Sequence, residues 1–205
     1  MSLIDSLIEG GWLKTPRIIE AFRKIKRVDF LPKDLEDLAE LNEALPIGYG
    51  QTISQPLVVA FMIEQLQPQP GDKILDIGSG SGWTAALLAE IVGPEGKVIA
   101  IDIISELVEF GRKNIEKYNF VKKGTVEFIC ADGYKGLEEE MPFDKILVSA
   151  TASEIPLAWK KQLKIGGRIV VPIGQSIFVV EKIDKTQFSE REYFGFSFVP
   201  LVKGK

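Results

Sequence analysis

The sequence has no histidine and a single cysteine, Cys130, among its 205 residues. Without histidine, Ser-His-Asp and Cys-His catalysis are excluded, and the commonest metal ligand is absent. A lone cysteine cannot form a disulfide within the chain, which fits a reducing compartment. Residues 1–5 lack the basic start of a signal peptide, and no apolar run is long enough to span a bilayer. We therefore expect a cytoplasmic protein with no metal centre and no membrane partner.

The chain also lacks a large excess of either sign of charge, because it has 25 basic and 29 acidic residues and a net charge of −4. No dense basic run occurs, which argues against phosphate-driven binding to nucleic acid. The hydrophobic fraction of 45% is typical of a soluble globular protein. A chain of this length can form one domain with a sizeable core and an appendage.

Apolar patterning divides the chain into three parts: residues 1–70 are helical in pattern, residues 71–175 alternate strands with helices, and residues 176–205 form a closing strand pair. The predicted strands are residues 73–77, 98–101, 126–131, 145–149, 168–172, 178–183 and 193–201. Short apolar strands separated by helices predict an α/β fold with a doubly wound, mostly parallel seven-stranded sheet, preceded by an N-terminal helical extension. The pattern leaves the order of the last two strands open.

The most informative stretch is the glycine run that follows the first of these strands. A strand that turns through glycines into a helix N-terminus makes a cradle for a nucleotide-like ligand. The residues expected to contact this ligand are Asp76, Gly78, Ser79, Gly80 and Gly82. The G-x-G-x-G spacing differs from the G-x-G-x-x-G of dinucleotide sites. Asp76 would suit the ammonium of a methionine group, whereas it would repel a pyrophosphate.

Two more carboxylates end the next strands, Asp102 about 20 residues past the run and Asp132 after the third strand. Asp102 can accept both hydroxyls of a ribose, and Asp132 can accept from an adenine amino group. Either one alone is more often a helix cap or a solvated loop residue. Their joint placement, together with the neighbouring Ile103 and Gly133, favours an S-adenosylmethionine site over a nicotinamide site.

A second informative stretch, residues 45–56, is named here the serine loop and contains the run Gly50-Gln51-Thr52-Ile53-Ser54-Gln55-Pro56. The chain resembles the protein-L-isoaspartate O-methyltransferase family in this loop, which has the form G-x-T-I-S-Q-P, and in further stretches along nearly its whole length. Those further stretches are residues 76–82, 132–133, 143–146, 162–168, 171–174 and 198–201. The resemblance implies a Rossmann-like, class I S-adenosylmethionine-dependent methyltransferase fold.

The resemblance also implies a reaction, the methylation of the α-carboxylate of L-isoaspartyl residues in damaged proteins. The ester then closes to a succinimide, which opens partly to normal aspartate. S-adenosylmethionine is the implied cofactor and S-adenosylhomocysteine the product. An α-carboxylate has a pKa of roughly 3.5, so it is ionised at neutral pH and needs no general base. We expect a monomer whose partners are damaged proteins and peptides.

Ser54 matches the active-site serine of the family, so its hydroxyl or the local backbone N–H groups should hold the substrate carboxylate. From position alone, Ser54 is also a plain cap of the helix that starts near Pro56. The resemblance assigns Thr52 and Ile53 to the passage between substrate and cofactor. Gln51, Leu201 and Val202 are further candidates for substrate contact.

The chain departs from the family pattern in places, since Leu57-Val58-Val59 are apolar where many members carry a histidine. Two other functions stay open. One is a related methyltransferase acting on an RNA base, a small molecule or an ordinary peptide aspartate. The other is a non-catalytic S-adenosylmethionine-binding module.

Overall fold

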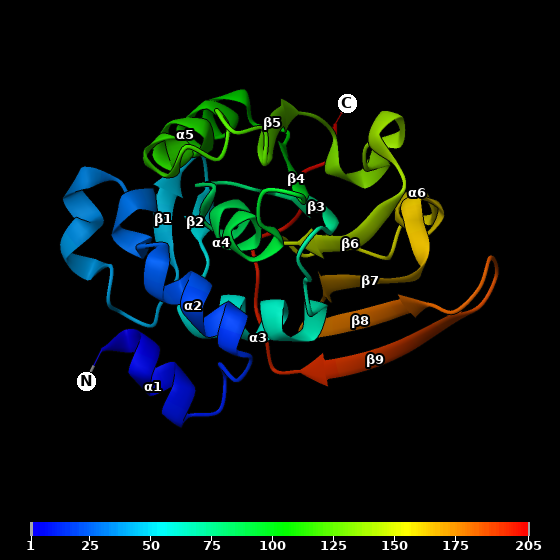
Figure 1. Ribbon diagram of the computed structural model, residues 1–205, viewed down its shortest axis with the longest axis horizontal. Coiled ribbons are helices and arrows are strands. Elements are labelled where there is room, and N and C mark those ends of the chain that lie inside the picture. The colour runs from blue at the N-terminus through cyan, green and yellow to red at the C-terminus, as the bar shows by residue number, and fades with distance from the viewer. Residues whose placement is uncertain (1, 205) are drawn as a thin grey trace.

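The computed structural model describes residues 2–204, which form one seven-stranded sheet with helices on both faces (Figure 1). The strand order is β5-β4-β3-β6-β7-β8-β9. The first five strands in that order are parallel, and β8 and β9 join antiparallel at the edge. The strands are β3 (Lys73–Ile77), β4 (Lys97–Asp102), β5 (Val126–Cys130), β6 (Phe143–Val148), β7 (Leu163–Ile173), β8 (Ser176–Lys182) and β9 (Phe188–Phe194). The predicted fold class is confirmed.

The two faces of the sheet bury separate cores, because successive side chains of a strand point in opposite directions. Ile74 packs with α3 (Pro56–Leu66), α4 (Trp83–Val92) and α5 (Ser105–Ile115) on one face. Leu75 and Ile77 pack on the other face, with Trp159 of α6 (Leu157–Gln162). The sequences of these strands are therefore nearly continuous apolar runs, as expected for parallel strands covered on both sides.

The N-terminal part is less helical than expected. It contains α1 (Leu3–Glu9), α2 (Pro16–Lys24) and the 3-10 turns Arg27–Phe30 and Lys33–Leu38. The serine loop is a β-hairpin of β1 (Leu45–Gly48) and β2 (Gln51–Ile53), followed directly by α3. Figure 1 shows this hairpin beside α4, close to the sheet. Later in the chain, short 3-10 turns occupy Glu116–Tyr118, Gly133–Lys135 and Glu138–Glu140.

The prediction of a last strand over residues 193–201 was wrong. The strand lies earlier, at Phe188–Phe194, where it pairs with β8 from Lys182↔Phe188 to Ser176↔Phe194. Its middle residues are charged or polar and exposed, so the segment looks like a loop in sequence. Charged side chains are typical of an edge strand, since they discourage pairing with another chain. The residues beyond β9 run past the carboxyl ends of the strands toward the opposite edge of the sheet, as the red trace in Figure 1 shows.

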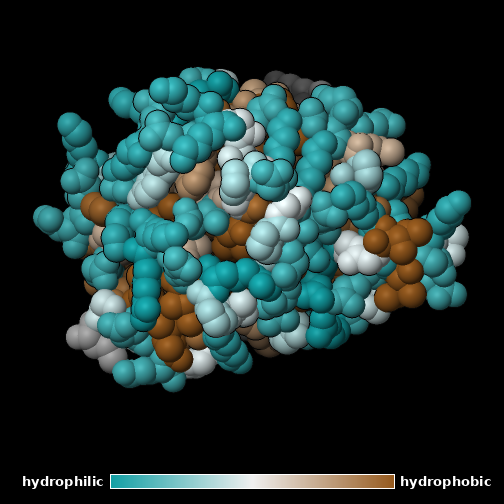
Figure 2. Space-filling view, in the orientation of Figure 1, coloured by the Kyte–Doolittle hydropathy of each residue, from teal (hydrophilic) through white to brown (hydrophobic). Residues whose placement is uncertain are grey.

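The sheet order places the carboxyl ends of β3, β4 and β6 together. The chain moves outward from β3 to β4 and β5, then returns past β3 to β6, so a topological switch point lies between β3 and β6. Ligands of open α/β sheets bind at such points. On the face in Figure 2, hydrophilic residues predominate and apolar ones lie in separate patches. Among residues 2–204, no helix combines the length and apolar character that a membrane crossing requires.

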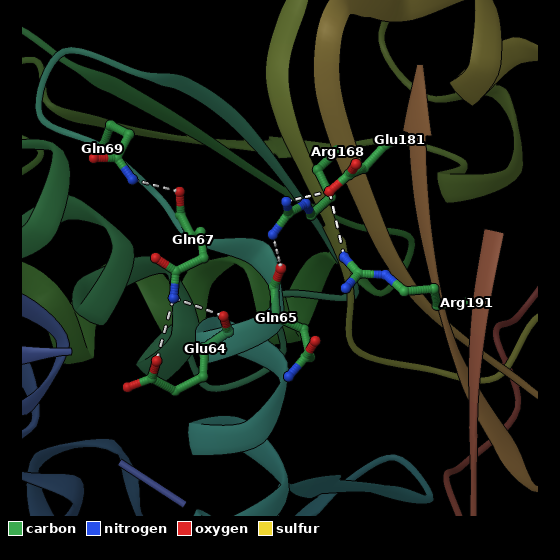
Figure 3. A network of polar contacts seen from close by, with 7 residues as sticks. All are labelled: Glu64, Gln65, Gln67, Gln69, Arg168, Glu181 and Arg191. Carbon is green, nitrogen blue, oxygen red and sulfur yellow. Dashed lines mark hydrogen bonds and ion pairs between the residues drawn. The ribbon is translucent and has the colours of Figure 1, made fainter. Parts of the chain in front are cut away.

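A polar network joins α3 to the antiparallel edge (Figure 3). The guanidinium of Arg168 on β7 donates to the carbonyl of Gln65 near the end of α3 and pairs with Glu181 of β8. Arg191 of β9 reaches the same Glu181 oxygen at 3.4 Å. One side chain therefore ties a helix to the outer strands.

Replacing Arg168 by alanine should lower the free energy of unfolding by about 2 kcal/mol, because a charged donor leaves both partners at once. For a domain of this size, that loss lowers the melting temperature by roughly 4–8 °C. Arg191→Ala is the matched control, since its side chain is 55% exposed and an exposed ion pair contributes little. Equal melting temperatures for Arg168→Ala and the wild type would show that the network does not stabilise the fold.

Candidate active site

The glycine turn between β3 and α4 is folded back against the end of β4. Both Gly78 and Ser79 donate their N–H groups to the carbonyl of Ile101, at 2.9 and 3.1 Å. Gly80 and Gly82 have φ values of +49° and +83°, a region that side chains disfavour. A Cβ at Gly82 would also lie 3.0 Å from the carbonyl oxygen of Gly111 on α5. Gly82 is therefore required for close approach of two helices as well as for the turn.

Two cavities open at the carboxyl ends of the strands. The first, named here the strand-end cavity, lies between the glycine turn, the ends of β3, β4 and β6, the serine loop and the C-terminal segment 199–202. The second, named the loop cavity, is lined by Ala44, Thr52, Ser54, Gln55, Val58, Ser149, Ser197, Phe198 and Val199. Four residues line both cavities: Thr52, Ser54, Ser149 and Val199. We call these four the shared wall.

Most residues predicted from the sequence meet at the strand-end cavity. Those that line it are Gln51, Thr52, Ile53, Ser54, Gly78, Ser79, Gly80, Asp102, Ile103, Gly133, Leu201 and Val202. Asp76, Gly82 and Asp132 are not part of its lining. Sequence reasoning missed several lining residues, among them Trp83, Thr84, Ser149, Ala150, Val199 and Pro200. The position of Ser149 at the end of a predicted strand was the one available signal for it.

Asp102 is 9% exposed and faces the strand-end cavity. Its oxygens accept hydrogen bonds from the N–H groups of Gly80 and Ile104, both at 3.0 Å. Burial raises the pKa of this carboxyl, while those backbone donors lower it. The N–H bonds fix the carboxylate in one orientation, with lone pairs left for a ligand's hydroxyl groups.

Asp76 is fully buried on β3 and is not among the residues that line either cavity. Its Oδ2 accepts a hydrogen bond from the hydroxyl of Thr84, at 2.8 Å. Its Oδ1 is buried and has no hydrogen-bond partner within residues 2–204. Burial raises the pKa of Asp76 from 3.8 to about 7. A carboxylate in this position is suited to a cationic ligand group, which would supply the missing partner.

Asp132 caps the 3-10 turn Gly133–Lys135, since its Oδ1 accepts from the N–H of Tyr134 at 3.0 Å. Its other oxygen faces the C-terminal segment, where a Cβ on Gly204 would lie 2.9 Å away. The same segment is held by Leu201, whose N–H donates to the carbonyl of Thr151 at 2.9 Å. Segment 199–202 thereby forms one side of the strand-end cavity.

Ser54 is not the cap of α3. The N-cap residue is Gln55, and the free N–H of Leu57 in the first turn is bonded by the side chain of Asn42 at 2.9 Å. The hydroxyl of Ser54 makes no hydrogen bond with any residue from 2 to 204. The structure thus leaves this hydroxyl available on the shared wall, while a residue 12 positions earlier caps the helix.

The side chain of Arg27 holds the serine loop and the segment before it in place. Its guanidinium donates to the carbonyls of Ala39, Leu41, Glu43 and Ser54, at 3.2, 3.0, 2.7 and 3.4 Å. The same group lies over the ring of Trp83, 5.5 Å from its centroid. The side chain is 6% exposed and has no ion-pair partner among residues 2–204, and burial lowers its pKa to about 10. Backbone carbonyls and an aromatic face stabilise this cation.

Two buried polar groups beside the strand-end cavity lack a hydrogen-bond partner within residues 2–204. They are the Ser79 hydroxyl and the Trp83 indole N–H, and both residues line the cavity. No Lys or Arg lines either cavity in this part of the chain, so an extended polyphosphate finds no cation there. Residues 2–204 hold no group of three side chains placed to share a metal ion.

Replacing Arg27 by methionine should lower the free energy of unfolding by about 3 kcal/mol, because buried carbonyls lose a charged donor. Segment 39–54 should also become more sensitive to proteolysis. Urea unfolding measures the first effect and limited digestion with mass spectrometry the second. Arg23→Met, on an exposed part of α2, should stay within about 0.5 kcal/mol of the wild type. A resistant segment in Arg27→Met would contradict the assigned role.

Asp76 should make the protein less stable as pH rises from 5 to 8. Its folded pKa of about 7 exceeds the unfolded value of 3.8, so its contribution is full below pH 4 and is lost as pH rises through 7. Asp76→Asn keeps the Thr84 contact and removes this titration. Urea unfolding at both pH values should show the variant gaining on the wild type at pH 8. An equal difference at both pH values would contradict the buried, shifted carboxyl.

Known proteins place the chain in a family. The family model described as protein-L-isoaspartate(D-aspartate) O-methyltransferase matches residues 1–205. A protein-L-isoaspartate O-methyltransferase of Methanopyrus kandleri is 42% identical over 204 residues, covering 98% of this chain and 89% of that protein. Protein-L-isoaspartate O-methyltransferase 2 of Archaeoglobus fulgidus is 44% identical over 188 residues, covering 90% of this chain and 84% of that protein.

Solved structures also resemble the chain. A protein-L-isoaspartate O-methyltransferase structure superposes with a TM-score of 0.86 at 30% identity, over 97% of this chain and 64% of that one. A Plasmodium falciparum protein described as such an enzyme, solved with S-adenosyl-L-homocysteine, shares the fold with a TM-score of 0.89 at 24% identity, over 98% and 97% of the two chains. The chain belongs to the protein-L-isoaspartate O-methyltransferase family.

Proposed function

We propose that the serine loop and strand-end cavity together transfer a methyl group from S-adenosylmethionine to the α-carboxylate of L-isoaspartyl residues in damaged proteins. Membership of the family makes the chain an S-adenosylmethionine-dependent methyltransferase. The observation that carries the proposal is the free hydroxyl of Ser54, which lies on the wall shared by two cavities. One cavity can hold the cofactor and the other the damaged residue.

On the cofactor side, Asp102 would accept the ribose hydroxyls, and Gly78, Ser79 and Gly80 would line the turn beneath the ligand. The unpartnered Oδ1 of Asp76 supports a role for this residue toward the ammonium group. Gly133 and Ile103 line the cavity, with Asp132 directly before Gly133. When bound, S-adenosylmethionine supplies an activated methyl group on a positively charged sulfur.

On the acceptor side, the chemistry needs no general base. The carboxylate is already ionised at neutral pH, so its oxygen bonds to the methyl carbon as the carbon–sulfur bond breaks, and no proton moves. The task left to the protein is to align the reacting atoms, which supplies on the order of 7–11 kcal/mol when the geometry is right. Ser54 would donate a hydrogen bond to the carboxylate. With no histidine in the chain, nothing activates Ser54 as a nucleophile.

The substrate would reach the shared wall through the loop cavity. Gln55, Val58 and Phe198 line this cavity, so it offers both polar and apolar surface to a peptide. Gln51, Leu201 and Val202 lie around the strand-end cavity, where they would contact the substrate at the junction. We further propose that the protein acts as a monomer on damaged proteins in the cytoplasm.

Two peptides that differ only in an isoaspartyl or aspartyl linkage test the reaction. The protein should methylate the isoaspartyl peptide with S-adenosylmethionine and leave its aspartyl twin unmodified, as followed by mass spectrometry. Equal methylation of both would indicate a general carboxyl methyltransferase. Cofactor binding with no transfer to either peptide would indicate a non-catalytic binding module.

Ser54→Ala should lower turnover of the isoaspartyl peptide by about 10²-fold, by analogy with loss of one donor from an anion-binding site. Affinity for S-adenosylhomocysteine, measured by calorimetry, should stay within about twofold. The melting temperature should not change, because Asn42 caps α3. Asn42→Ala should instead cost about 1 kcal/mol of stability. Unchanged turnover in Ser54→Ala would remove the serine from the mechanism.

A further inference from the structure

Ser149 is a second free hydroxyl on the shared wall. It directly follows β6, and its N–H donates to the carbonyl of Ile77 at the end of β3, at 2.9 Å. This bond anchors the residue at the switch point of the sheet. Its hydroxyl makes no hydrogen bond with any of residues 2–204, although the residue is half-buried. It lines both cavities, as Ser54 does.

The shared wall contains no charged residue. Three of its four members, Thr52, Ser54 and Ser149, carry hydroxyls, and the fourth is Val199. Neither cavity is lined by Lys or Arg in the part of the chain that the structure describes, and the sequence has no histidine. A carboxylate has about four acceptor sites, which these neutral donors are placed to fill. An anion that meets the wall must therefore be held by hydroxyl and backbone donors rather than by an ion pair.

We propose that Ser149 is a second carboxylate-binding residue of the transfer reaction. Ser54 donates to the substrate carboxylate from the hairpin, and Ser149 donates to it from the sheet. Donors on two separate elements fix the plane of the carboxylate as well as its position, which aligns one oxygen toward the strand-end cavity. Neutral donors also leave more negative charge on that oxygen than an ion pair would. This inference rests on the proposed function.

The test compares Ser149→Ala with Ser149→Thr, which keeps the hydroxyl. Ser153→Ala is the matched control, because Ser153 is an exposed serine four residues later that lines neither cavity. Ser149→Ala should lower kcat/KM for an isoaspartyl peptide by about 10- to 100-fold, the effect of losing one hydrogen bond to a charged group. Ser149→Thr should recover most of that loss, and Ser153→Ala should match the wild type.

A second readout does not depend on turnover. Calorimetry measures the affinity of the isoaspartyl peptide for the protein saturated with S-adenosylhomocysteine. Ser149→Ala should weaken this affinity by roughly the same factor, 10- to 100-fold. Its affinity for S-adenosylhomocysteine and its melting temperature should equal those of the wild type.

The outcomes separate the two proposals. An active wild type with full kcat/KM in Ser149→Ala would overturn the role of Ser149 alone. A loss of peptide affinity matched by a loss of S-adenosylhomocysteine affinity or of melting temperature would likewise overturn it, in favour of a structural role. A wild type that does not methylate the isoaspartyl peptide would overturn the proposed function, and this inference with it.

Discussion

The contact on which the rest of the site depends is that of the Arg27 guanidinium with four backbone carbonyls. Three belong to segment 39–43 and one to Ser54, so a single buried cation joins the segment before the serine loop to the loop itself. It also lies on Trp83, at the start of the helix that follows the glycine turn. A lysine could not replace it, because a point-like ammonium has no planar fork to reach four acceptors.

A consequence of that contact is that the Ser54 hydroxyl is not needed to cap α3. With segment 39–43 held by Arg27, Asn42 is positioned to bond the first turn of α3. The helix is therefore capped without the serine, whose hydroxyl remains for a substrate. The shared wall carries only neutral side chains, so the proposed substrate carboxylate would be held there without an ion pair. A reaction between an anionic oxygen and a cationic methyl donor needs alignment and exclusion of water, and a chain without histidine can provide both.

Much of the fold was predictable, because strands buried on both faces leave continuous apolar runs and the glycine turn interrupts the first of them sharply. The edge strand β9 was not, since its exposed middle residues carry charges and imitate a loop. The sequence correctly placed the glycine turn, Asp102 and Asp132 at or just beyond strand ends. It carries no sign of which way the side chains of Asp76, Asp102 and Asp132 point. In the structure only Asp102 lines the cavity, while Asp76 bonds Thr84 and Asp132 caps a turn.

Motifs identified the serine loop but could not decide between a helix cap and a free hydroxyl. That decision depends on Asn42, which belongs to no motif and approaches α3 only in the folded chain. In the proposed reaction, cofactor and substrate meet at the shared wall. A crystal structure with S-adenosylhomocysteine and an isoaspartyl peptide tests it most directly. We expect the sulfur in the strand-end cavity, the peptide in the loop cavity, and its carboxylate within about 3 Å of the Ser54 hydroxyl. A peptide carboxylate bound away from Thr52, Ser54 and Ser149 would show that transfer does not take place at the shared wall.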